Sequence, residues 1–305
     1  MSKYLSILLL CCLPAWLWAG ENYRFRVYLK DKGNDGYRVE EPEVFLSKKA
    51  IERRAKNNIA VTDADFPISR SYIEMLSGTG AIPVVQSKWF ATVVVESPDS
   101  AVVEQLRQLA IVDSVKWIWK GNLRFPAGEK GEGRFVSEDE PLRNEYGYAH
   151  RQIKMLNGVK LHEAGFRGEG MRVAVIDAGF MNADRMSAFD SLRLLGTYNV
   201  VFPGRSVFTG DDHGTKVLSC LAADIPGVMV GTAPKASYLL LKSEDSDSEY
   251  PVEEDYWTAA VEYADSAGVD VISSSLGYFV FDTDELSYDR AALDGRTAMI
   301  SRAAG

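Results

Sequence analysis

Cysteine and histidine are both scarce in this chain of 305 residues, which has three of each. Cys11 and Cys12 lie in the N-terminal segment, so Cys220 is left alone and no intramolecular disulfide framework can form. The position of Cys220 in an apolar helical pattern predicts a buried, inert thiol. The histidines form no His-Glu-x-x-His pattern, and the sequence therefore gives poor support for a protein zinc site.

An excess of positive charge is also lacking. The formal net charge is -9 and the sequence pI is about 5.0, whereas binding to a nucleic-acid backbone requires a basic face. We therefore expect no nucleic-acid partner. The 46% hydrophobic and 25% charged fractions are typical of a globular protein, and 305 residues are enough for two domains.

The one strongly apolar segment is short and lies at the N-terminus. Lys3 precedes an apolar run at residues 5–13, and residues 15–20, which end in Ala19 and Gly20, provide a plausible small-residue cleavage site. This pattern predicts a signal peptide at residues 1–19 and an exported product, either secreted or in the cell envelope. The run is too short for a comfortable membrane span, so no stable membrane anchor is expected, with an uncleaved anchor as the alternative.

Residues 20–121 carry the pattern of a small α+β domain. Strands are expected at 23–29, 82–86, 91–96 and 115–119, and helices at 69–76 and from Pro98 onward. The order β-α-β-β-α-β predicts a ferredoxin-like sandwich. A further helix is expected at 47–56 with Ser47 as its cap, and its basic residues, which include Arg53 and Arg54, are interpreted as a solvated face. Residues 122–145, rich in glycine and charge, are expected to be an exposed linker.

Residues 146–305 change to a different pattern. Short runs at 173–176, 197–202, 238–241 and 269–273 predict strands, and the first is continuously apolar and largely β-branched, as expected of a strand buried on both faces. Helices are expected at 155–165, 213–223 and 253–267. Strands that alternate with helices predict a doubly wound parallel α/β sheet.

Two residues of this second domain are candidates for chemistry. Asp177 ends the first central strand, at the sheet edge where ligands of open α/β sheets bind. His213 opens a helix, and Gly214 beside it allows a neighbouring chain to approach closely. An aspartate that orients a histidine base is the better use of this pair, although Asp177 could also act alone as the nucleophile of another α/β hydrolase or a phosphatase.

Four short motifs together resemble the subtilisin-like serine peptidases. They are Ala-Val-Ile-Asp-Ala-Gly at 174–179, His-Gly-Thr at 213–215, Gly-Thr-Ala-Pro-Lys-Ala at 231–236 and Ser-Leu-Gly at 275–277. Their order and spacing are similar to that family, whose triad runs Asp, His, Ser. The resemblance covers residues 146–305, and the α+β unit before it is similar to the family's inhibitory, folding-assisting prodomain.

This resemblance implies a secreted zymogen that hydrolyses polypeptides and carries its prodomain as an intramolecular inhibitor. Asp177 would hold His213 in the right tautomer, and His213 would be the general base toward a serine. Ser275, Leu276 and Gly277 would form the edge strand that pairs with an extended substrate. No cofactor is implied.

The sequence departs from the family pattern in one decisive way. The family's nucleophile lies in a Gly-Thr-Ser helix start after the histidine, and residues 1–305 contain no such run. We therefore expect this chain to be a C-terminally truncated fragment, without the nucleophile or the oxyanion asparagine, and catalytically inert. The non-enzyme alternative is a short product in which the prodomain serves as a binding or inhibitory module. Ala178 and Lys216 are minor departures.

The stretch 244–255 holds seven carboxylates. Calcium takes six to eight oxygen ligands, but no ligand spacing can be recognised here. A solvated loop that leads into a helix N-terminus explains the charge equally well. No metal site is predicted, and calcium is left as an open alternative.

Overall fold

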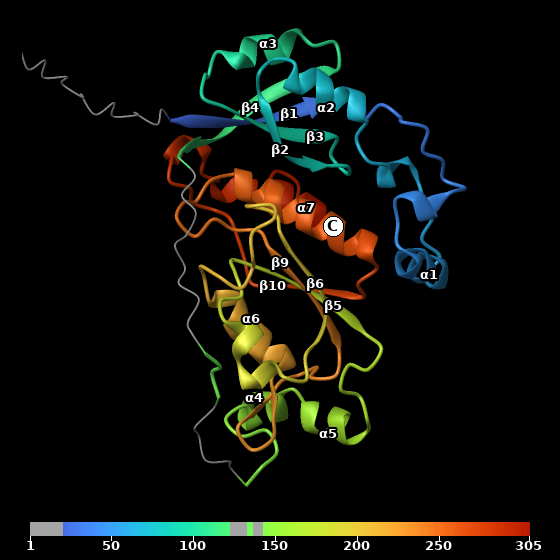
Figure 1. Ribbon diagram of the computed structural model, residues 1–305, viewed down its shortest axis with the longest axis vertical. Helices are drawn as coiled ribbons and strands as arrows, with labels where there is room; N and C mark the ends of the chain where they lie inside the picture. The colour runs from blue at the N-terminus through green and yellow to red at the C-terminus, as the bar shows by residue number, and fades with distance from the viewer. Residues whose placement is uncertain (1–20, 123–132, 137–142) are drawn as a thin grey trace, which may run out of the picture.

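The computed structural model describes residues 21–122, 133–136 and 143–305 of the chain. These residues form two four-stranded sheets and a small two-stranded one, and one long helix, α7 (Val252–Ala267), lies between the two larger sheets (Figure 1). The predicted signal peptide, residues 1–19, lies outside the described residues, as does most of the predicted linker.

The N-terminal domain is an antiparallel sheet with two helices. Its strand order is β2-β3-β1-β4. In chain order its elements are β1 (Asn22–Leu29), α2 (Arg70–Ser77), β2 (Ile82–Ser87), β3 (Thr92–Ser97), α3 (Val102–Gln108) and β4 (Val112–Gly121). This is the ferredoxin-like order, so the predicted α+β sandwich is confirmed.

The two faces of β1 have different partners, as its alternating sequence requires. Phe25, Val27 and Leu29 belong to the domain's own core, together with Leu76 of α2 and Leu106 of α3. On the other face of β1, the buried Arg24 and Arg26 contact α7, where they donate to Tyr256 and Asp255. Helix α3 begins at Val102, later than expected, because the turn before it is held by side chains of its own residues.

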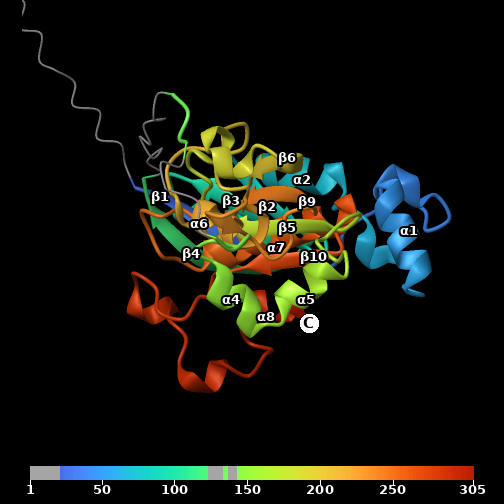
Figure 2. The ribbon, with the colours of Figure 1, turned by 90° about the horizontal axis from the view of Figure 1, so that it is seen from below.

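Between β1 and α2 the chain makes an excursion, residues 31–69, that contains α1 (Lys48–Lys56). Figures 1 and 2 both show α1 to one side of the two sheets. Ser47 caps it as predicted, since its Oγ accepts a bond of 3.1 Å from the amide of Ala50. The prediction of a solvated basic face is wrong for Arg53 and Arg54, which both bind Asp265 near the end of α7. The excursion therefore contacts the C-terminal end of α7 through these two ion pairs.

The C-terminal domain is built on a parallel sheet of order β10-β5-β9-β6. The strands are β5 (Arg172–Asp177), β6 (Arg193–Asn199), β9 (Ser237–Lys242) and β10 (Val271–Ser274). The other elements, besides short 3-10 turns, are α4 (His150–Met155), α5 (Gly158–Glu163), α6 (His213–Ala222), the hairpin β7 (Asp224–Ile225) and β8 (Met229–Val230), and α8 (Met299–Ala304). Figure 2 shows the segment after β10 running out beside the sheet before it reaches α8.

Alternate residues of β5 face two different cores. Val173 and Val175 pack on the α6 side with Leu218, whereas Ala174 and Ile176 pack on the α7 side. A strand buried on both faces needs continuous apolar residues, which is the pattern its sequence shows. Helices thus cover both faces of the parallel sheet, and the predicted doubly wound α/β fold is confirmed.

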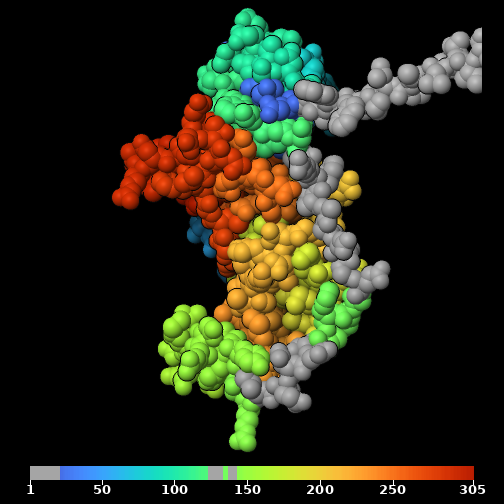
Figure 3. Space-filling model, turned by 90° about the vertical axis from the view of Figure 1, so that its left-hand side faces the viewer, coloured from blue at the N-terminus to red at the C-terminus, as the bar shows by residue number. Residues whose placement is uncertain are grey.

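Helix α7 is the layer shared by the two domains. Ile118 and Trp119 of β4 belong to the same core as Tyr256 and Ala260 of α7. Figure 3 shows the N-terminal domain lying directly on the α7 region, with no gap between them. The shared core places the prodomain-like sheet against the helix that runs behind the candidate site.

Two predicted elements have different bounds in the structure. The helix expected at 155–165 is the shorter α5, and a separate helix, α4, ends at Met155 before it, because Asn157 takes a left-handed conformation with φ of 57°. The strand expected at 197–202 ends at Asn199, whose side-chain oxygen accepts a 2.8 Å bond from the amide of Phe202 and turns the chain.

The predictions for Cys220 and for the acidic stretch 244–255 also need correction. Cys220 is exposed, because it lies on the face of α6 that points away from Leu218 and the sheet. The acidic stretch is not simply a solvated loop, since it buries four carboxylates: Asp245, Glu253, Glu254 and Asp255.

Candidate active site

Asp177 is the last residue of β5, and its side chain is fully buried at the carboxyl edge of the sheet. Its Oδ1 accepts a 2.8 Å hydrogen bond from the amide of Ala178. Its Oδ2 is buried and has no hydrogen-bond partner among the described residues. The hydrogen bond from the next residue along the chain, Ala178, thus holds the Asp177 carboxylate in one orientation.

His213 is the first residue of α6, and its ring faces Asp177. The distance from His213 Nδ1 to Asp177 Oδ1 is 2.7 Å, and the His213 side chain is half exposed. The Oδ1 atom of Asp211 accepts a 2.7 Å bond from the His213 amide and so fixes the start of the helix. The structure therefore brings the two predicted residues together, one buried and one open to solvent.

Gly214 makes this approach possible. A Cβ atom at position 214 would overlap the carbonyl oxygen of Gly179 and would lie 2.9 Å from the Cβ of Asp177. Only glycine leaves room for the helix to start against the end of β5. The sequence-based expectation of a close approach at this glycine is confirmed.

The electrostatics of the pair follow from burial and hydrogen bonding. Burial raises the pKa of Asp177, while the hydrogen bonds from His213 and Ala178 partly offset that rise. The hydrogen bond to Asp177 raises the pKa of His213, and the negative charges of Asp177, Asp211 and Glu244 add to this rise against the opposing effect of burial. With Nδ1 facing a carboxylate, the ring proton is assigned to Nδ1, and Nε2 is left to accept a proton.

Lys242 is a member of this site that sequence reasoning missed. It pairs with Asp177 in the register of β9 and β5, it is 2% exposed, and its Nζ donates to the carbonyl oxygen of Ala178. Burial lowers the pKa of Lys242, against the opposing effect of Asp211, Asp245 and Glu244. The sequence feature that could have identified Lys242 is its position as a single lysine at the end of an apolar strand, next to the strand that ends in Asp177.

Residues 275–277 lie just beyond β10, the edge strand of the described sheet. Ser275 and Gly277 are exposed, and Leu276 is half-buried against the α7 core. The preceding Ser274 is fixed by a 2.9 Å bond from Trp257 Nε1 to its Oγ. Because Ser274 pairs with Ile176, the segment continues beside the end of β5, but it forms no hydrogen bond with Asp177 or His213 in the described part of the chain.

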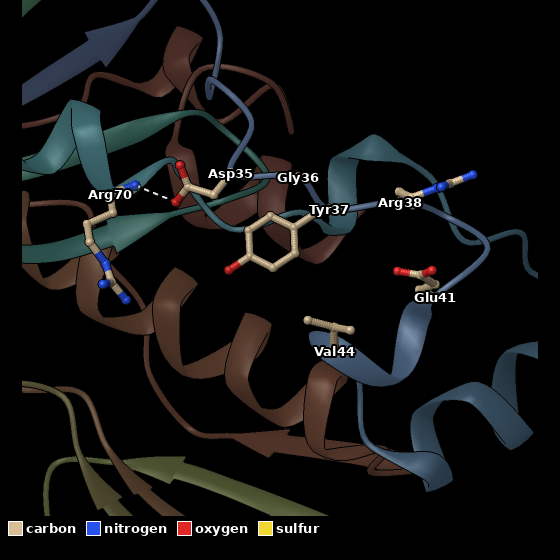
Figure 4. A pocket seen from close by; sticks show the side chains of 7 residues that line it. All are labelled: Asp35, Gly36, Tyr37, Arg38, Glu41, Val44 and Arg70. Carbon is tan, nitrogen blue, oxygen red and sulfur yellow. Dashed lines mark hydrogen bonds between the residues drawn. The ribbon is translucent and has the colours of Figure 1, made fainter.

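The described surface has several hollows. One of about 300 Å³ adjoins the start of α6 and is lined by residues that include Phe135, Met181 and Thr215. A hollow of about 450 Å³ lies far from the pair, in the excursion of the N-terminal domain (Figure 4). Its arginines, Arg38 and Arg70, lie on opposite sides of Tyr37 and do not converge, so it has no organised binding groups.

No group of three or more His, Cys, Asp or Glu side chains in the described part of the chain is arranged to hold a metal ion. No helix there combines the length and the apolar character needed to cross a bilayer.

Comparison with known protein families gives two matches, which follow one another along the chain. The sequence model of the peptidase S8 propeptide domain of Bacteroidota matches residues 24–132, and that of the subtilase family matches residues 168–305. The first match contains the ferredoxin-like domain, and the second contains both Asp177 and His213.

Individual relatives agree with these matches. The chain is 32% identical over 150 residues to subtilisin E of Bacillus subtilis, which covers 47% of this chain and 36% of the relative. It is 30% identical over 141 residues to the major intracellular serine protease of the same organism, which covers 41% of this chain and 40% of the relative. The chain thus spans well under half the length of these relatives.

A solved structure is similar across almost the whole chain. The epidermin leader peptide processing serine protease of Staphylococcus aureus aligns with a TM-score of 0.51 at 12% identity, covering 93% of this chain and 55% of that one. At this identity the likeness concerns the fold alone.

Proposed function

Because this chain belongs to the subtilase family and carries the propeptide domain of that family, we propose that it is part of a serine endopeptidase precursor that acts on polypeptides. The observation that supports this most directly is the 2.7 Å bond between Asp177 Oδ1 and His213 Nδ1. In this bond Nδ1 of the histidine is held by the carboxylate, and Nε2 is left free to act as the base.

The proposed roles follow from this geometry. Asp177 holds the tautomer of His213 and stabilises its charged form, and His213 takes the proton of a serine hydroxyl and passes it to the leaving amine. Residues 275–277 pair with the extended substrate backbone, supported by their place at the end of an edge strand. The reaction needs no cofactor.

The reaction also needs a serine nucleophile and an oxyanion donor, and we assign neither to a residue of 1–305. Residues 1–305 by themselves are therefore proposed to be inert. The N-terminal domain, docked on α7 through a shared core, serves as the intramolecular inhibitor. Export is proposed from the N-terminal pattern of Lys3 and the apolar run after it.

The phosphatase-like alternative fits the geometry poorly. An aspartate nucleophile needs a carboxylate oxygen that a substrate can reach. The Asp177 side chain is fully buried, and its Oδ1 is already held by two donors.

A fluorophosphonate probe, which modifies activated serines, tests the proposal. We expect no labelling of residues 1–305 alone. Any longer product of the gene should be labelled on a serine outside this segment, and the His213→Ala change should abolish that labelling. Robust labelling within residues 1–305 would overturn the proposed inertness. Labelling that survives His213→Ala would overturn the proposed base.

A further inference from the structure

Lys242 is a buried cation beside the Asp177–His213 pair, and the proposed reaction gives it no role. It is the last residue of β9, it follows four aromatic or aliphatic residues at 238–241, and it is 2% exposed. In the described part of the chain its ammonium forms no ion pair. Burial of an ammonium is costly, so a lysine here is favourable only if its donor group meets an acceptor.

That acceptor lies in the turn that ends β5. Nζ of Lys242 donates to the carbonyl oxygen of Ala178. One residue earlier in the same turn, the carbonyl oxygen of Asp177 accepts a 3.1 Å bond from the amide of Ser243. The end of β9 therefore holds two successive carbonyl groups of the turn, one through a side chain and one through the main chain.

The two carbonyl groups belong to peptide units that orient the pair. The unit between Asp177 and Ala178 also carries the amide that donates a 2.8 Å bond to Asp177 Oδ1. The next unit leads into Gly179, whose carbonyl oxygen lies so close to α6 that a Cβ at Gly214 would be 2.4 Å from it. A rotation of these units would move the Asp177 carboxylate relative to His213, the first residue of that helix.

The origin of the Lys242 side chain is itself fixed. Its main chain pairs with Asp177 of β5 on one side and with Asn199 of β6 on the other, because β9 lies between these strands. Its carbonyl oxygen also accepts a 2.9 Å bond from the amide of Val200. A donor that projects from such a strand can support the turn precisely.

We propose that Lys242 is a positioning residue for the Asp177–His213 pair. Its ammonium fixes the turn at 177–179 and so keeps the Asp177 carboxylate against the His213 ring. Because Lys242 is 2% exposed, it does not contact the substrate and acts only through this turn. The inference rests on the proposed function, which gives the pair its task, and it adds a third side chain to the site.

The test measures the pKa of His213 by NMR titration of the imidazole in the full chain, so it does not depend on catalysis. Lys242→Met keeps the length of the side chain and removes its donor. The hydrogen bond to Asp177 raises the pKa of His213, so a displaced carboxylate should lower it. We expect a fall at least half as large as in Asp177→Asn. In the Asp177→Asn background Lys242→Met should cause no further fall, because the lysine acts through Asp177.

Leu239→Ala is the matched control. Leu239 lies on the same strand, is 4% exposed and packs in the core on the α7 side. This change should lower the melting temperature but leave the pKa of His213 unaltered, which separates positioning from a general loss of packing. If Lys242→Met does not fold, Lys242→Gln, which also lacks the charge and is one bond shorter, is titrated in its place with the same expectation.

An unchanged pKa of His213 in Lys242→Met would overturn the proposal. A rise would overturn it as well, since the lysine would then act on the histidine only through its positive charge. An equal fall with and without Asp177 would show that Asp177 is not the intermediary. The peptidase proposal is tested separately by the serine probe. Labelling of a longer product together with an unchanged pKa would remove only the role of Lys242, and a fall in pKa without labelling would remove only the peptidase proposal.

Discussion

Arg26 of β1 and Asp255 of α7 form a buried ion pair across the junction of the two domains, with Arg26 Nε 2.8 Å from Asp255 Oδ1. Both side chains are 3% exposed, and Arg26 also donates a 3.0 Å bond to the carbonyl oxygen of Pro251. Burial of two charges is favourable only when the charges meet with good geometry, which a two-point contact of this kind provides.

Removal of one partner should therefore cost more than the pair itself contributes. We expect Arg26→Gln to lower the free energy of unfolding by about 3–5 kcal/mol, because Asp255 is left buried without its cation. Urea denaturation of the full chain measures this. Arg107→Gln, which breaks the exposed pair with Glu104, is the matched control and should change stability little. Equal effects of the two changes would contradict a buried, coupled pair.

The hydrogen bond between Asp177 and His213 should be visible in the titration of the histidine. Asp177→Asn removes the largest cause of the raised pKa of His213, so we expect that pKa to fall. Imidazole chemical shifts followed by NMR between pH 4 and 9 report it. Asp113→Asn, an exposed change in the N-terminal domain, serves as the control. An unchanged His213 pKa in Asp177→Asn would show that the pair does not interact in solution.

Glu253 should make the protein less stable as the pH rises. Its pKa is about 10 in the folded chain, above the value of about 4.3 for a free glutamate. The folded state thus keeps a proton that the unfolded state loses, and stability falls with pH between these values, by up to about 1.4 kcal/mol per pH unit. Glu253→Gln mimics the protonated group and should flatten this slope in urea titrations from pH 5 to 9. A slope equal to that of the wild type would mean that Glu253 is ionised when folded.

The close contact at Gly214 predicts a steric effect on both stability and the site. In Gly214→Ala the new methyl group meets the backbone of Gly179 and the side chain of Asp177, so the start of α6 must shift. We expect a loss of about 1–3 kcal/mol and a lower His213 pKa, as the bond to Asp177 lengthens. The control is Gly277→Ala, where no atom lies within 4 Å of the new Cβ, and it should be nearly neutral. Full stability of Gly214→Ala would refute the steric argument.

The sequence predicted what depends on local pattern. The alternation in β1 and the continuous apolar run of β5 identified both sheets, and the residues at the ends of β5 and at the start of α6 identified the pair. Asp177 and His213 lie 36 residues apart, but a strand end and a helix start at the same sheet edge could be placed together from the fold alone.

The sequence could not predict contacts between distant charged segments. Arg26 and Asp255 are 229 positions apart, and Arg53 and Asp265 are 212 apart. Each group looks like part of a solvated face when only its own helix or strand is considered. The same limit explains the acidic stretch, since Glu253 lies in the first turn of α7 and is buried beside Tyr278, which is 25 positions further along the chain. These errors concern which surfaces meet, not which elements form.

If the N-terminal domain is removed, one face of helix α7 is in contact first with that domain and then with water. While that domain is docked, Asp255 and Glu262 lie in an interior and are satisfied by Arg26 and by Ser87, Lys88 and Trp89. Once it leaves, the same carboxylates would face water, which hydrates them without help. A wholly apolar face would bind the N-terminal domain but would leave an exposed apolar patch afterwards, whereas the carboxylates beside the shared core are readily hydrated once the domain leaves.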